Sequence, residues 1–110
     1  MPIQLTTAIS GGDFEPSPLT HAKIVFFATN LIDSLIEIRV MLGSVANGNF
    51  IPAQIQNFGT TVKAFTISGS DYTTLIATTA SAQGVILYDE VAEKLYQWLL
   101  TNNHFAGTIV

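Results

Sequence analysis

The side chains that could carry out catalysis are few and widely separated. The chain of 110 residues has two histidines and no cysteine. A serine–histidine–acid centre needs a histidine beside a nucleophile and oriented by a carboxylate. His21 opens a β-type segment and His104 follows a helical one, and no spacing places either beside a serine and an acid. We therefore predict a protein that is not an enzyme.

The acidic residues do not form a recognisable metal or glycosidase motif. Three of the eight lie within residues 89–93, where helical spacing favours an interaction with the helix dipole and with solvent. Hydrolysis of a glycoside requires two facing carboxylates. Glu37 with Asp33 or Asp71 stays open as such a pair, although no motif favours it. The glycines match neither a dinucleotide-binding nor a Walker pattern, so we predict no metal and no cofactor.

Charge is scarce along the whole chain. Four Lys and Arg and eight Asp and Glu make up 11% of the residues, whereas 48% are hydrophobic and the net charge is −4. An average soluble domain is about 25% charged. The few cations are spread out, which argues against nucleic-acid and membrane-surface partners, because both need clustered Lys or Arg. The composition favours other protein chains as partners, and a homo-oligomer in particular.

The chain divides into an N-terminal arm, residues 1–20, and a single domain, residues 21–110. A breaker-rich stretch at residues 11–18 separates the two. Ile3, Leu5 and Ile9 give the arm apolar side chains that could become buried on a neighbouring subunit. There is no signal peptide and no apolar run long enough to cross a membrane, which indicates a cytoplasmic protein.

The first half of the domain has β-type patterns. Residues 22–31 are rich in β-branched and aromatic types, and residues 35–42 alternate between apolar and charged side chains. Residues 30–34 form a predicted turn between these strands. Residues 43–49 contain an Asn-Gly pair and form a second predicted turn. Extended structure is then predicted for residues 50–58 and again for 62–68.

The second half changes to helical spacing. A short helix is predicted over residues 71–77, a loop over 78–84, an amphipathic helix over 87–100, and a last short strand or a docked tail over 106–110. This order predicts an α+β fold in which an antiparallel sheet of four to five strands packs against the C-terminal helix and the short helix. The alternative is a β-sandwich or barrel with one attached helix.

Apolar residues at unusual positions are candidates for contacts between chains. Phe26 and Phe27 are adjacent, so in a strand they point to opposite faces. Phe65 and Ile67 share a face with Lys63, and Leu100 falls on the polar face of the long helix. With the apolar arm residues, the predicted interface set is as follows: Ile3, Leu5, Ile9, Phe26, Phe27, Phe65, Ile67 and Leu100.

Two runs in the second half of the chain carry a resemblance to a known family: FTISGSDY at residues 65–72 and LYDEV…LYQWL at residues 87–99. Over roughly residues 36–100 the sequence resembles small virion proteins of tailed bacteriophages, which implies a location in the virion. In those proteins an extended hairpin is followed by an F-x-I-x-G-x-D-[YF] turn and a closing helix with two Leu-Tyr pairs. The resemblance implies a structural role in a head, neck, tail or fibre, with virion proteins as partners and no catalytic residues. The arm lies outside it.

A second class of function stays open beside assembly. Aromatic side chains, including Trp98, could line a cleft in a small module that binds a ligand or a glycan. Such a site requires an exposed aromatic cluster with polar neighbours.

Overall fold

The structure, a computed structural model, describes residues 2–9, 18–54, 56–79 and 88–110. In these residues the predicted α+β fold is confirmed, with one antiparallel sheet of six strands and two helices. The strands are β1 (Ile3–Ile9), β2 (Leu19–Asn30), β3 (Leu35–Ala46), β4 (Asn49–Pro52), β5 (Val62–Ile67) and β6 (Gly107–Ile109). The helices are α1 (Gly69–Thr79) and α2 (Tyr88–Thr101).

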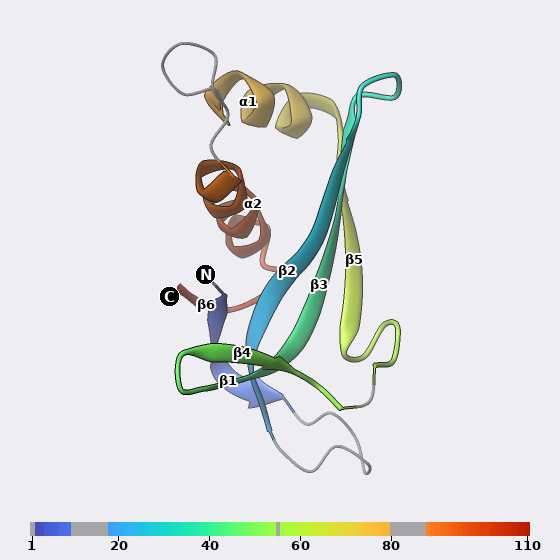
Figure 1. Cartoon of the computed structure of the whole chain (residues 1–110). Helices are drawn as coiled ribbons and strands as arrows, with labels where there is room; N and C mark the ends of the chain where they lie inside the picture. The colour runs from blue at the N-terminus through green and yellow to red at the C-terminus, as the bar shows by residue number, and fades with distance from the viewer. Residues whose placement is uncertain (1, 10–17, 55, 80–87) are drawn as a thin grey trace.

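A long hairpin formed by β2 and β3 is the backbone of the sheet. The strand order is β4-β3-β2-β1-β6, and β5 pairs with β3 as well. Strand β3 can accept two partners on one edge because they occupy different lengths of it: residues 36–41 pair with β5 and residues 43–46 pair with β4. Both helices lie on the same side of this hairpin (Figure 1). We call that side of the sheet the inner face and the opposite side the outer face.

Alternation along β3 decides which side chains form the core. Ile36, Ile38, Val40 and Leu42 are buried, whereas Glu37 and Arg39 between them are exposed, as period-two spacing predicts. Ile67 and Phe65 of β5 stand opposite Ile36 and Ile38 and therefore share the inner face. The helices cover this face with a set of fully or nearly fully buried side chains: Leu75, Leu95, Tyr96 and Leu99.

A β-bulge in β2 interrupts the pairing with β3. Ile24 stands opposite Val40, yet Phe26 stands opposite Arg39, so Val25 is an extra residue. The insertion of one residue reverses the alternation of all later side chains in the strand. Phe26 therefore lies on the outer face with Arg39, and Phe27 lies on the inner face opposite Ile38. Without the bulge, Phe26 would continue the inner-face series of Ala22 and Ile24.

A side chain from α2 supports the strand next to the bulge. The buried amide of Ile24 donates a hydrogen bond to the Tyr96 hydroxyl oxygen at 2.8 Å. The pairing of β1 with β2 ends with Ile3 opposite Ala22, so no described β1 residue stands opposite Ile24. The Tyr96 hydroxyl thus satisfies a buried amide, which would be costly to leave without an acceptor.

The N-terminal segment differs from the prediction of an arm. Residues 3–9 form β1 between β2 and β6, and Ile3 is completely buried in the core. The Val110 amide also donates to the Pro2 carbonyl at 2.9 Å, which joins the two ends of the chain. The arm prediction is therefore wrong for residues 3–9, because β6 and β2 provide hydrogen-bonding edges on both sides. Residues 10–17 lie outside the described residues.

Most other predicted elements match with shifted ends. The extended segment predicted over residues 50–58 is a strand only up to Pro52, and residues 80–84 of the predicted loop lie outside the described residues. The β3–β4 turn is centred on Asn47 and Gly48, which have positive φ angles of 54° and 78°, so β3 runs past the predicted turn start at Gly43. Gly43 lies inside the strand, where a Cβ would collide with the Ile51 carbonyl oxygen and approach the Phe50 ring. Helix α1 is longer than predicted, and α2 and β6 fall where expected.

We expect Tyr96→Phe to destabilise the fold by about 1–3 kcal/mol, because it leaves the buried Ile24 amide without its hydroxyl acceptor. Urea unfolding followed by circular dichroism measures the change. Tyr72→Phe is the matched control, since the half-buried Tyr72 hydroxyl has no hydrogen bond to a described residue. Equal effects of the two substitutions would contradict a special role for the Tyr96 hydroxyl.

Candidate functional site

Exposed apolar side chains lie along the half of the β2–β3 hairpin that leads to its turn. Eight large hydrophobic side chains are exposed in the described part of the chain, and four of them fall within residues 25–32. Val25 and Phe26 are 48% and 46% exposed, and Leu31 and Ile32 at the turn are 77% and 95% exposed. We call residues 25–35 the distal hairpin. Because half of the exposed set lies in one short stretch, the distal hairpin is the strongest candidate for an interaction surface.

The turn that carries Leu31 and Ile32 is ordered by its own polar groups. The Asn30 side-chain oxygen accepts hydrogen bonds from the amides of Ile32 and Asp33, both at 3.1 Å. The Asn30 amide nitrogen donates to the Asp33 carboxylate at 2.8 Å. Asn and Asp favour such turns because their short side chains replace backbone hydrogen bonds. The two exposed aliphatic side chains are therefore carried on an ordered turn, at the end of the hairpin that β2 and β3 form (Figure 1).

Cations on the outer face cover aromatic rings. The Arg39 guanidinium lies 5.3 Å from the centre of the Phe26 ring, and the Lys23 ammonium lies 5.8 Å from that of Phe50. Both distances fit cation–π contacts. The two cations thus partly shield the rings of Phe26 and Phe50 from solvent. Leu31 and Ile32 at the turn have no comparable ring or cation contact in the described chain.

The structure separates the predicted interface residues into three groups. Ile3 and Ile67 are completely buried in the core, so they are unavailable to a partner and this part of the prediction is wrong. The reason is that both pair with central strands on the inner face. Phe26 is exposed on the distal hairpin. The remaining residues are partly buried against the core: Leu5, Ile9, Phe27, Phe65 and Leu100.

Three exposed residues of the distal hairpin were missed by the sequence reasoning. Leu31 and Ile32 fall inside the predicted turn at residues 30–34. The sequence signal that could have identified them is the presence of two aliphatic residues in a turn, where side chains are exposed to solvent. Val25 had no comparable signal, because its exposure follows from the bulge.

The histidines and acids considered for catalysis do not converge. His21 Nδ1 lies 2.8 Å from the Thr20 hydroxyl, whereas the His104 ring packs between Phe65 and Trp98. Glu37 is on the outer face and Asp71 bonds to Trp98 on the helical side, so these two carboxylates do not face each other. Among the described residues, no three histidine or acidic side chains are grouped so that they could hold a metal ion.

Comparison of the chain with protein-family models, with curated proteins and with solved structures finds no match. Within the described residues, no helix combines the length and the apolar character needed to span a membrane.

We expect the double substitution Leu31→Ser with Ile32→Ser to change the free energy of unfolding by less than about 0.5 kcal/mol, because neither side chain is packed in the fold. In contrast, Ile38→Ala at the fully buried centre of β3 should cost about 2–5 kcal/mol. Urea titration of each variant measures both values. A large loss in the double variant would show that the turn side chains support the fold.

Proposed function

We propose that the protein is a non-enzymatic structural protein that acts through contacts with other protein chains, and that the distal hairpin makes these contacts. The observation that carries the proposal is the pair Leu31 and Ile32, which are 77% and 95% exposed on an ordered turn. Isolated apolar residues on a surface are ordinary. Four within eight residues of one hairpin, two of them at its turn, give this hairpin apolar area that a partner can bury.

Apolar burial and a small loss of conformational entropy both favour binding through the distal hairpin. Burial of an exposed Leu or Ile side chain provides about 1.5–3 kcal/mol. The hydrogen bonds of Asn30 already hold the turn in place, so little conformational entropy is lost when it binds. The turn carries one acidic residue, Asp33, and its side chain is bonded to Asn30. A protein pocket that receives two aliphatic side chains is the partner that this chemistry fits.

The partner that we propose first is another copy of this chain, within a larger assembly. Only 11% of the residues of the chain are charged. This scarcity of charge is what we expect of a protein whose surface is covered by neighbouring chains. The resemblance of residues 36–100 to small virion proteins of tailed phages supports a head, neck, tail or fibre as the assembly, and virion proteins as further partners.

We expect the wild-type chain to form oligomers between about 1 and 100 µM in sedimentation-velocity experiments. The double substitution Leu31→Ser with Ile32→Ser should raise the dissociation constant about 100-fold, because two apolar side chains lose about 3 kcal/mol of burial. Sedimentation coefficients across a dilution series measure this change.

Phe58→Ser is the matched control, since Phe58 is 70% exposed but lies outside the distal hairpin. This variant should associate as the wild type does. A wild-type chain that stays monomeric over the whole concentration range would contradict self-association. An oligomer that is equally stable in the double variant would remove the distal hairpin from the interface.

A further inference from the structure

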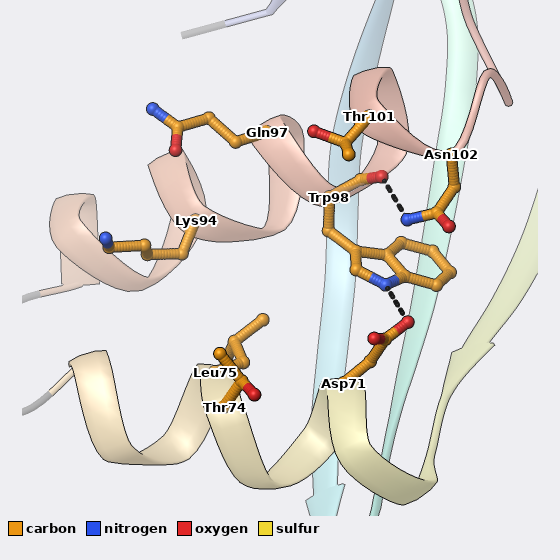
Figure 2. A pocket seen from close by; sticks show the side chains of 8 residues that line it. All are labelled: Asp71, Thr74, Leu75, Lys94, Gln97, Trp98, Thr101 and Asn102. Atoms are coloured by element: carbon orange, nitrogen blue, oxygen red, sulfur yellow. Dashed lines mark hydrogen bonds between the residues drawn. The ribbon is translucent and has the colours of Figure 1, made fainter.

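A groove lies between α1 and α2, on the side of the sheet opposite to the outer face. It has a volume of about 400 Å³ and is open to solvent. Figure 2 shows Asp71, Thr74 and Leu75 on α1 across from Trp98 and its neighbours on α2. Ligand sites usually occupy about 300–1,000 Å³, so the groove is large enough for a small ligand.

The Trp98 indole is fixed in this groove from several sides. The indole Nε1–H donates to the Asp71 carboxylate at 3.0 Å, and the backbone carbonyl of Trp98 accepts a hydrogen bond from the Asn102 side chain at 2.9 Å (Figure 2). The His104 ring packs 5.2 Å from the indole, measured between ring centres, and the Phe65 ring packs 4.6 Å from His104. The half-buried indole is therefore a rigid apolar surface, which lowers the entropy cost of binding a ligand.

The polar side chains around the indole define the class of ligand. Among the described residues that line the groove, Asp71 is the one acid and Lys94 the one base, so the charges of these lining residues cancel. Gln97, Thr101 and Asn102 supply amides and hydroxyls, which both donate and accept hydrogen bonds. Such a lining suits a neutral ligand with many hydroxyl groups better than a phosphate, which needs several cations, or an aliphatic ligand.

The carboxylate of Asp71 has a free position for such a ligand. One oxygen accepts from the Trp98 indole, and the other makes no hydrogen bond to a described residue. A carboxylate accepts strong, charge-assisted hydrogen bonds from hydroxyl groups. A sugar ring presents a face of C–H groups and a rim of hydroxyls, and the indole surface beside Asp71 matches both.

We infer that the groove between α1 and α2 binds a neutral saccharide, with a sugar ring against the Trp98 indole and a hydroxyl group on Asp71. This inference does not depend on the proposed assembly role, because it uses the helices rather than the distal hairpin.

The chain contains one tryptophan, so its fluorescence reports directly on the groove. The chain of residues 1–110 is titrated with each sugar to about 100 mM: glucose, galactose, mannose, N-acetylglucosamine, maltose, lactose and chitobiose. At least one of these sugars should change the Trp98 emission and the NMR signal of its indole N–H in a saturable way, with a dissociation constant of about 0.1–10 mM, typical of a small open site. Asp71→Asn should weaken that sugar at least about tenfold, because the charge-assisted hydrogen bond is lost.

Asp33→Asn is the matched control, because it makes the same substitution on the distal hairpin, and it should leave sugar binding unchanged. Thermal unfolding of both variants shows whether each retains its fold. The inference is overturned if no sugar gives a saturable response in either measurement, if glycine or inorganic phosphate binds and the sugars do not, or if folded Asp71→Asn binds sugar as tightly as the wild type. The double variant Leu31→Ser with Ile32→Ser should still bind sugar. A result that contradicts the assembly proposal can therefore be distinguished from a result that contradicts sugar binding.

Discussion

The hydrogen bond from the Ile24 amide to the Tyr96 hydroxyl is the contact on which the arrangement of this protein depends. It joins the long hairpin to α2 across 72 positions of sequence, and it lies next to the bulge at Val25. Because a bulge reverses the alternation of a strand, the same local geometry directs Phe27 into the core and Phe26 to the surface. A strand without the bulge would exchange the two phenylalanines and leave Phe26 in the space beneath the helices.

This constraint gives the two faces of the sheet different roles. The inner face is filled by the helices, and the groove with Trp98 lies between those helices. The outer face carries two cation–aromatic pairs, Lys23 with Phe50 and Arg39 with Phe26. Half of the four cations of the chain therefore cover aromatic rings. Scarce charge is concentrated where it shields apolar surface, and the turn at Leu31 and Ile32 is left unshielded.

Much of the fold could be predicted because its signals are local. The alternation at residues 35–42 and the helical spacing at residues 87–100 identified β3 and α2 and the buried side of each, since both periods are set by the backbone itself. The candidate surface was predicted only in part. Phe26 was named, whereas Ile3 and Ile67 were assigned to an interface although their pairing partners bury them.

The sequence by itself determined most element types, the antiparallel α+β class and the apolar faces of β3 and α2, because these follow from residue types within a few positions of one another. Only the tertiary structure decided that residues 3–9 join the sheet, that Phe26 rather than Phe27 faces outward, and that Asp71 meets Trp98. Each of these outcomes needs a partner far away along the chain. Strand β1 forms because β2 and β6 offer it hydrogen-bonding edges, and the Tyr96 hydroxyl supports the strand beside the bulge in β2. No local pattern of residues encodes either of these partners.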